Sequence, residues 1–333
     1  MSRLGRKIRP LRYFVEYIGA LLALAFIRLV PKMGLRPMAW FAGLFLRATP
    51  KFRKLVMANL RVAFPEREES ELRRIMIENA TLTPLTVLEL FWFSTHPKAL
   101  DTLIDFPDKY VELTNQMGGT GRGAMWMVSH FGNWELAGLK FEQQSDFPLA
   151  VVVRPLNNTR LNKLLSSGRS SQGTRVIPAK GAVRGIMKAL KDGFFVATLI
   201  DQNTRARDGG VFVDFFGLPA PISRAPAMFA RKVGASVAVG GALRTGKRYM
   251  LFVRELPKPV AEYSSDEELL RAMMAIYEDL IREHPEQYLW FYEKWRHIPE
   301  WLEEKRKAKY PYYSSVVTPR FYSEKAPKEP KKK

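Results

Sequence analysis

Short apolar runs alternate with amphipathic segments through the middle of the chain. Runs of about four to eight apolar residues bounded by turn residues are typical of buried strands. Such runs predict strands at residues 124–129, 149–154, 174–179, 194–201, 235–244 and 248–256. Apolar positions three and four apart predict helices at residues 134–144, 159–171, 182–193, 225–234 and 265–284.

This alternation predicts an α/β fold with a mostly parallel sheet flanked by helices, because strands that are apolar throughout need cover on both faces. The last two extended runs follow one another closely, so we expect them to pair as an antiparallel edge.

The first part of the chain has a different pattern. Residues 13–31 are strongly apolar, but their uncharged core is only Tyr17–Ile27, and a spanning helix needs about 20 residues. A second apolar piece covers residues 38–46. We predict a membrane-associated helical segment over residues 1–55, with two short helices dipping into one leaflet. A single span and a pair of buried core helices are the alternatives.

Charge is concentrated at the two ends of the chain. The net charge is +20, of which residues 1–54 carry +11 and residues 301–333 carry +6. A nucleic-acid-binding domain places its basic face on the folded body, so we expect no nucleic-acid partner. Basic residues around apolar segments instead predict attraction to anionic membrane lipids. We expect a catalytic domain at 56–304 and a basic, disordered tail at 305–333.

Candidate chemistry lies in the stretch HFGNWE, residues 130–135. His130 follows a predicted strand, and the carboxyl ends of parallel strands are where open α/β sheets bind ligands. Glu135 falls in the first turn of the next helix, and across such a turn the two side chains can meet. A carboxylate beside an imidazole fixes its tautomer and stabilises the imidazolium, which makes the histidine a general base.

The alternative for this pair is structural: Glu135 would be an ordinary first-turn charge and His130 a surface loop residue. We do not expect Ser129 to act as a nucleophile with His130, because adjacent strand residues point to opposite faces. The chain has no cysteine and its four histidines lack zinc-ligand spacing, so we expect no metal site.

The His130–Glu135 spacing and the sequence blocks that follow it resemble those of a known family. His-x4-Glu resembles the His-x4-Asp/Glu signature of glycerolipid-type acyltransferases, and specifically that of the lipid A biosynthesis lauroyl/myristoyl (late) acyltransferases. Further blocks follow in family order: RPLNN (154–158), VIPAKGA (176–182), LIDQN (199–203), GVFVDFFGLPAP (210–221) and PEQYLWFYEKWR (285–296).

The resemblance implies a membrane-bound enzyme on the cytoplasmic face of the bacterial inner membrane. It would transfer a fatty acyl chain from an acyl-carrier-protein or coenzyme A thioester to a hydroxyl of a lipid A precursor, without a cofactor. His130 would be the general base and Glu135 its orienting partner.

Other residues gain roles from the same resemblance. Arg154 would bind phosphate or support the developing oxyanion, although a structural pair explains it too. Asp201 and Gln202 would belong to the site. Arg169 and Arg205 are candidate phosphate ligands, with solvated charges as the alternative. The aromatic run at 290–295 fits core packing or an interfacial belt as well as acyl-chain binding.

Two other functions remain open. One is a phosphatidylinositol mannoside or other glycolipid acyltransferase with a similar dyad. The other is a non-enzymatic protein of the membrane surface. The intact dyad and the intact blocks around Arg154 and Asp201 favour an enzyme.

Overall fold

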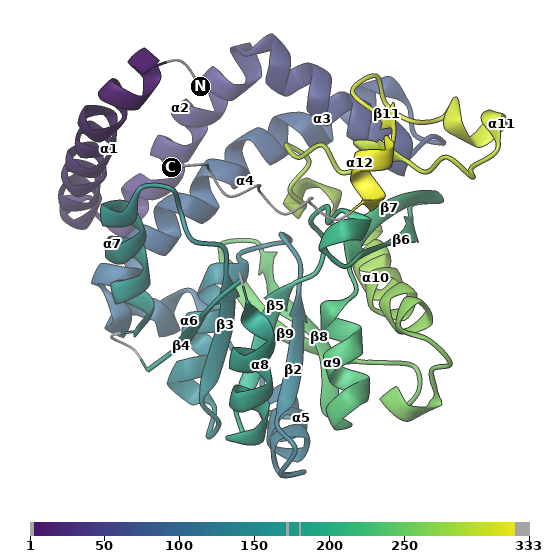
Figure 1. Ribbon diagram of the computed structural model, residues 1–333. Coiled ribbons are helices and arrows are strands. Elements are labelled where there is room, and N and C mark those ends of the chain that lie inside the picture. The colour runs from purple at the N-terminus through teal and green to yellow at the C-terminus, as the bar shows by residue number, and fades with distance from the viewer. Residues whose placement is uncertain (1–2, 171–172, 180, 324–333) are drawn as a thin grey trace, which may run out of the picture.

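The computed structural model describes residues 3–170, 173–179 and 181–323 (Figure 1). Its centre is a seven-stranded sheet of order β1-β9-β8-β2-β5-β3-β4. The strands are β1 (Ile104–Asp105), β2 (Ala124–Val128), β3 (Leu149–Val153), β4 (Arg175–Pro178), β5 (Phe195–Leu199), β8 (Ser236–Thr245) and β9 (Arg248–Glu255).

Most of this sheet is parallel, as the sequence predicts. β8, β2, β5, β3 and β4 run in one direction, and β9 pairs antiparallel with β8. The predicted antiparallel pair is therefore confirmed, but it is not the edge, because β1 pairs parallel with the outer side of β9. All of β2 is buried, in keeping with cover on both faces of the sheet.

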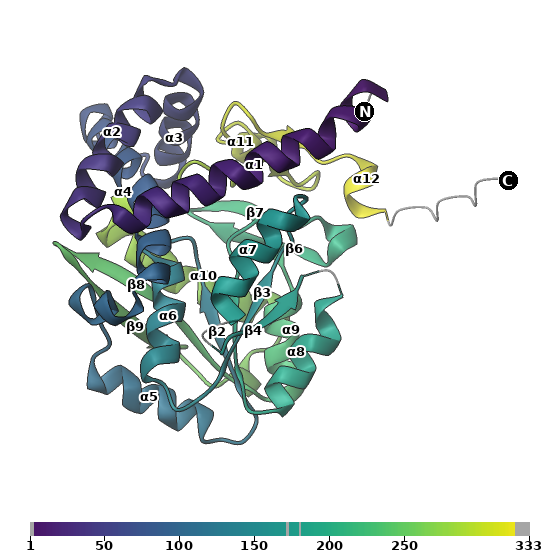
Figure 2. The ribbon, with the colours of Figure 1, turned by 90° about the vertical axis from the view of Figure 1, so that its left-hand side faces the viewer.

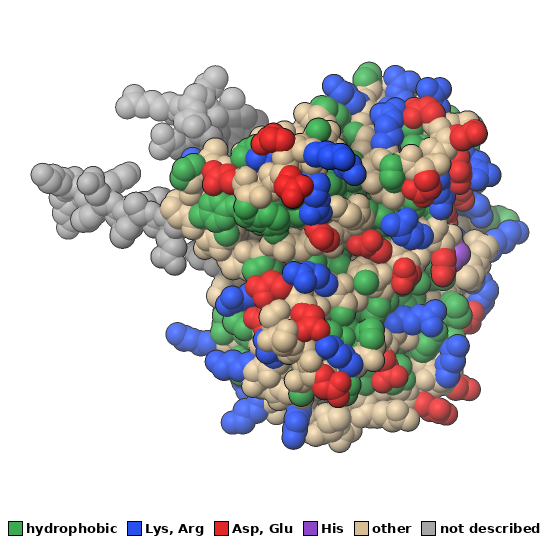
Figure 3. Space-filling model, turned by 90° about the vertical axis from the view of Figure 1, so that its right-hand side faces the viewer, with side chains coloured by type: hydrophobic (Ala, Val, Ile, Leu, Met, Phe, Trp, Pro, Cys, Tyr) green, Lys and Arg blue, Asp and Glu red, His purple; other side chains and the backbone are tan. Residues whose placement is uncertain are grey.

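Helices supply that cover. Figure 2 shows α5 and α6 on one side of the sheet and α8 and α9 on the other. The helices of this body are α5 (Asp108–Gly118), α6 (Trp134–Gln144), α7 (Thr159–Ser170), α8 (Ala182–Lys191), α9 (Ala225–Val233) and α10 (Asp266–Glu283). On the side that carries α10, basic and acidic side chains are interspersed (Figure 3), which agrees with the near balance of charge between residues 55 and 300.

Four N-terminal helices arch over one end of the sheet (Figure 1). They are α1 (Arg3–Leu29), α2 (Leu35–Ala48), α3 (Pro50–Ala63) and α4 (Glu69–Thr95). The expected domain boundary at residue 55 falls inside α3, whose residues Phe52, Val56 and Leu60 are buried. The arch and the sheet therefore share one continuous core.

The two apolar N-terminal pieces form helices, as predicted, and α1 is longer than its uncharged core. Large apolar side chains are exposed along α1 and α2: Phe14, Ile18, Leu22, Phe26, Leu29, Trp40, Phe41, Leu44 and Phe45. Among the described residues, no single helix has the length and apolar content to cross a membrane. Residues 12–29 and 32–48 meet those criteria only together, and they are bent by 118° where they join.

The expected disordered tail is wrong for residues 305–323, which fold onto the body. This segment contains α11 (Glu304–Lys307), β11 (Ser315–Val316) and α12 (Pro319–Tyr322), and β11 pairs with β10 (His297–Ile298). Phe321 is buried and stacks on Phe212 of the hairpin β6 (Gly210–Phe215) and β7 (Leu218–Ser223). Residues 324–333 of the predicted tail lie outside the described residues.

Candidate active site

His130 lies just beyond the carboxyl end of β2, as the sequence predicts. β2 ends at Val128, and α6 begins at Trp134. Asn133 caps that helix, because its side-chain oxygen accepts a hydrogen bond from the Leu136 backbone N–H at 3.2 Å. The turn between strand and helix therefore carries the imidazole into the space beneath the N-terminal arch.

The backbone of this turn is held from two other segments. The N–H of Gly132 donates to the Gln287 carbonyl, and the N–H of Asn133 donates to the Ala242 carbonyl, both at 2.9 Å. Gly132 has φ +61°, and a Cβ on it would lie 1.9 Å from the Ala242 carbonyl oxygen. Only glycine fits here, so the position of His130 is fixed by the sheet rather than by a mobile loop.

The carboxylate that orients His130 is Asp201, which follows β5. Its Oδ1 is 2.8 Å from His130 Nδ1, and its Oδ2 accepts hydrogen bonds from the His130 backbone N–H at 3.0 Å and from Ser129 Oγ at 2.8 Å. Asp201 is 2% exposed. The Ser129 hydroxyl therefore donates to Asp201 and is not hydrogen-bonded to the His130 ring. Asp201 holds the imidazole in the way that the sequence suggested for Glu135.

This geometry selects one tautomer of the imidazole. An ionised Asp201 only accepts hydrogen bonds, so Nδ1 carries the proton and Nε2 keeps its lone pair. The side-chain N–H of Gln202 donates to this lone pair, with 3.3 Å between the two nitrogens, so Gln202 lies on the Nε2 side of the ring. Burial lowers the pKa of His130, but the charge and hydrogen bond of Asp201 and the charge of Glu135 together raise it above the ordinary value.

Glu135 lies in the first turn of α6, as expected. Its carboxylate acts on the imidazole through charge, and this contribution is smaller than that of Asp201. The two predicted dyad members are therefore electrostatically coupled, while Nδ1 donates its hydrogen bond to Asp201, 71 positions away along the chain.

Lys294 is a member of the site that the sequence reasoning missed. Its side chain is buried, and Nζ donates to the Asp201 carbonyl oxygen at 2.7 Å. Burial lowers the pKa of Lys294 to about 8, against the opposing effect of Asp201. Lys294 lies in the aromatic run at 290–295, where Trp290 and Trp295 are almost fully buried. Their burial supports the core-packing interpretation of that run.

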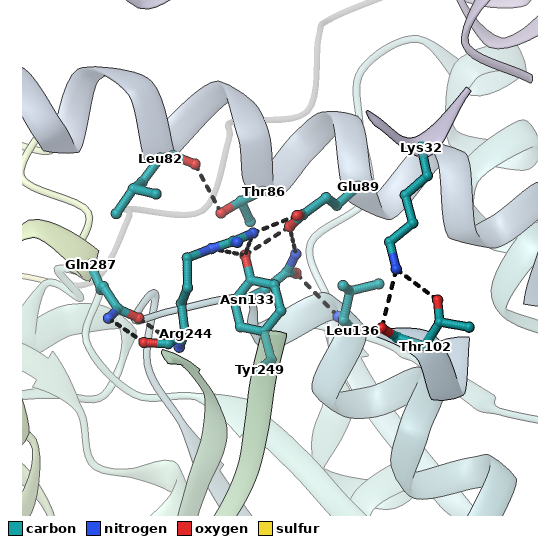
Figure 4. Close-up of polar contacts among 10 residues, drawn as sticks. All are labelled: Lys32, Leu82, Thr86, Glu89, Thr102, Asn133, Leu136, Arg244, Tyr249 and Gln287. Atoms are coloured by element: carbon teal, nitrogen blue, oxygen red, sulfur yellow. Dashed lines mark hydrogen bonds and ion pairs between the residues drawn. The ribbon is translucent and has the colours of Figure 1, made fainter. Parts of the chain in front are cut away.

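A second polar group supports the turn that carries His130, and it comes from α4 (Figure 4). Glu89 accepts hydrogen bonds from the Asn133 side chain at 3.2 Å and from the Tyr249 hydroxyl at 2.7 Å, and it forms an ion pair with Arg244. Both Glu89 and Arg244 are largely buried. The pair ties the arch, the turn and the β8–β9 hairpin together, and no motif in the sequence pointed to it.

The arginines expected to bind phosphate differ in their surroundings. Arg154 is exposed immediately after β3. Its charge lowers the pKa of the Tyr292 hydroxyl, against the larger opposing effect of burial. Arg205 forms an ion pair with Asp208 at 2.6 Å, which fits its solvated alternative. Arg169 belongs to α7, but its side chain lies outside the described part of the chain.

Two cavities flank the catalytic turn. The first, of about 220 Å³, is lined by His130, Trp134, Arg244 and residues of α4. The second, of about 110 Å³, lies between α6 and strands β2, β3 and β5, and is lined by Trp134 and Glu135 at its upper end. Trp134 lines both cavities and lies edge-on to the His130 ring, 4.8 Å between centroids. His130 lines the first cavity, and Trp134 connects the imidazole to the second.

Comparison with known proteins identifies the family. The sequence model of the bacterial lipid A biosynthesis acyltransferases matches residues 2–297. The chain belongs to this family. It is an acyltransferase, and the resemblance seen in the sequence is confirmed.

Curated relatives of this acyltransferase have modest sequence identity. The lipid A biosynthesis lauroyltransferase of Escherichia coli K12 is 27% identical over 87% of this chain and 94% of its own length. The myristoyltransferase of the same organism is 23% identical over 92% and 95%. A phosphatidylinositol mannoside acyltransferase of Mycolicibacterium smegmatis is 31% identical, but over only 35% of this chain and 39% of its own length.

Proposed function

We propose that this acyltransferase moves a fatty acyl chain from an acyl thioester to a hydroxyl of a lipid A precursor. The observation that carries the proposal is the Asp201–His130 hydrogen bond, which leaves Nε2 basic beside the first cavity. The lipid A acceptor follows from the family and from relatives that match most of the chain. Acyl carrier protein and coenzyme A are both suitable thioester carriers.

His130 Nε2 is the proposed general base. It removes the proton of the acceptor hydroxyl as that oxygen attacks the thioester carbonyl. The imidazolium formed is stabilised by Asp201 and by the charge of Glu135. Collapse of the tetrahedral intermediate breaks the carbon–sulfur bond, and the imidazolium returns the proton to the departing thiolate. The side-chain amide of Gln202, which lies 3.3 Å from His130 Nε2, is the proposed donor to the oxyanion.

Arg154 is the proposed contact for a phosphate of the acceptor or of the donor. It is exposed at the carboxyl end of β3, on the same edge of the sheet as His130 and Asp201. Its planar guanidinium can form paired hydrogen bonds to phosphate. Arg169 stays a proposal of the same kind, and Arg205 is a weaker one because Asp208 already pairs with it.

We further propose that the protein attaches to the cytoplasmic face of the bacterial inner membrane through α1 and α2. The exposed apolar side chains of Phe14, Ile18, Leu22 and Phe26 are spaced four residues apart along α1, so they lie on one face of that helix. The positive charge of residues 1–54 would add attraction to anionic lipids. Figure 2 shows α1 above α7, close to the active-site end of the sheet, so attachment there would bring lipid substrates near His130.

A phosphatidylinositol mannoside acceptor is the second candidate, because the match to that acyltransferase has the higher identity over a shorter stretch. The test offers the purified protein an acyl thioester with each acceptor separately. Acylation of the lipid A precursor supports the first proposal, and acylation of the mannoside alone supports the second. Without acylation of either acceptor, both proposals are wrong.

A further inference from the structure

The second cavity is an apolar slot that runs from the catalytic turn down one face of the sheet. Its upper end is formed by Trp134 and Glu135, and its walls come from α6 and from the side chains of β2, β3 and β5. Its lower end is formed by Glu142 and Thr174. Apart from these ends its lining is almost entirely apolar, which suits a saturated hydrocarbon chain.

Two elements measure the length of this slot. From Trp134 to Glu142, α6 advances about 12 Å, at about 1.5 Å per residue. From Val153 to Leu149, β3 covers about 13 Å, at about 3.3 Å per residue. A zigzag hydrocarbon advances about 1.25 Å per carbon, given carbon–carbon bonds of about 1.5 Å. The elements that line the slot therefore span the length of about 10 carbons beyond the reacting carbonyl.

The floor of the slot is polar. Thr174 Oγ1 donates to Glu142 Oε1, and Glu142 Oε2 is buried without a hydrogen-bond partner among the described residues. Burial raises the pKa of Glu142 to about 7. A methyl group pushed against this carboxyl gains no apolar contact and blocks its access to water, so a chain should stop there.

A separate hollow lies on the other side of this floor. It is lined by Phe93, Pro97 and Leu100 together with Leu139 and Glu142. Leu139 and Glu142 line both spaces. These two side chains are thus a partition, one turn apart on α6, and truncating either would join the slot to the hollow.

We propose that the slot binds the acyl chain of the donor, and that Leu139 and Glu142 set its length at about 10–12 carbons by closing the slot. This inference rests on the proposed acyl-transfer function and deepens it. The first cavity is left for the acceptor, with Trp134 separating the two ligands above His130.

A substitution at Gly138 should shorten the slot, whereas truncating Leu139 or Glu142 should lengthen it. It lines the slot one turn above Glu142, and a Cβ on it would meet only Leu149 Cδ2, at 3.7 Å. The backbone therefore has room for a Cβ at this position, and the longer side chain of Gly138→Leu should fill part of the slot. Glu142→Gln keeps the volume of the partition, and Gln143→Ala alters a residue that lines only the outer hollow.

The experiment measures initial rates of acyl transfer to the lipid A precursor from octanoyl, decanoyl, lauroyl, myristoyl and palmitoyl thioesters. All five use the carrier with which the wild type is faster. The wild type should prefer decanoyl or lauroyl over palmitoyl by about tenfold or more. Glu142→Ala and Leu139→Ala should each raise the palmitoyl-to-lauroyl ratio by about tenfold, and Gly138→Leu should favour octanoyl. Glu142→Gln and Gln143→Ala should keep the wild-type ratio.

The two levels of the proposal fail differently. If the folded variants transfer acyl groups with unchanged chain preference, the donor chain does not occupy the slot and the inference is overturned. If the wild type transfers no chain of any length, the acyl-transfer proposal itself is wrong.

Discussion

Replacing Asp201 with asparagine should remove the base while leaving the shape of the site. Oδ2 of Asp201 accepts two hydrogen bonds, from Ser129 Oγ and from the His130 backbone N–H. An asparagine would keep its oxygen at that position and turn its NH₂ group toward His130 Nδ1. Nδ1 would then have to accept, so the proton would move to Nε2. The imidazole would lose the lone pair that takes the hydroxyl proton.

The charge lost in this variant sets the size of the effect. With Oδ1 at 2.8 Å from Nδ1, a full ion pair is worth about 4–6 kcal/mol at an effective dielectric constant of about 20. Only part of the imidazolium charge has developed in the transition state, so we expect a loss of about 3–5 kcal/mol. This corresponds to a kcat lower by about 10²–10⁴-fold.

The assay compares initial rates of acyl transfer for Asp201→Asn and wild type from about pH 6 to pH 9, a range that spans the ordinary His pKa. Because the tautomer is wrong, the variant should not recover at high pH. Asp208→Asn is the control, since Asp208 is exposed and pairs with Arg205. Thermal unfolding checks that the proteins are folded. A rate within about threefold of wild type across this range would refute the assignment of His130 as a base held by Asp201.

Three further predictions concern Glu135, Glu142 and the N-terminal arch. Glu135→Gln removes a charge that raises the pKa of His130, so the acidic limb of the kcat/KM profile should move to lower pH; an unmoved limb would show that this charge does not act on the base. Folding raises the pKa of Glu142 from 4.5 to about 7, so the wild-type protein loses stability as the pH rises from about 4.5 to about 7. In chemical denaturation, Glu142→Gln should be more stable than wild type by about 1–2 kcal/mol near pH 8, a figure reduced for partial exposure, and equally stable below about pH 4.5. Changing both Leu22 and Phe26 to Asn should weaken binding to anionic vesicles by about 100-fold, at about 1.5 kcal/mol each, whereas changing the exposed Val183 to Asn should not; wild-type binding should also weaken as added salt shortens the Debye length. Equal binding by the wild type, the double variant and Val183→Asn would exclude α1 as the anchor.

The elements of the central sheet were predictable because each is a local pattern. The predicted helix at 134–144 has the bounds of α6, and the predicted strand at 124–129 contains β2. β1 was missed because two residues give no periodicity. The folded segment at 305–323 was missed because its lysines and prolines resemble a linker, while its order comes from distant contacts such as Phe321 on Phe212.

The part of the site that depends on residues close together in the sequence was predictable. His130 could be found from its place after a strand and before a capped helix. Its orienting carboxylate could not, because Glu135 and Asp201 are equally plausible until the pairing of β2 with β5 brings the ends of those strands together. The same holds for Lys294 and for the pair of Glu89 with Arg244, whose partners lie far apart along the chain.

The most direct test of the account is the mass of the acceptor after reaction. Purified wild-type protein is incubated with a lipid A precursor and an acyl thioester, and the products are analysed by mass spectrometry beside those of His130→Ala. We expect the wild type to add one acyl group to the acceptor and His130→Ala to be slower by about 10²–10⁴-fold. An unchanged acceptor with the wild type, or equal rates for the two folded proteins, would contradict it.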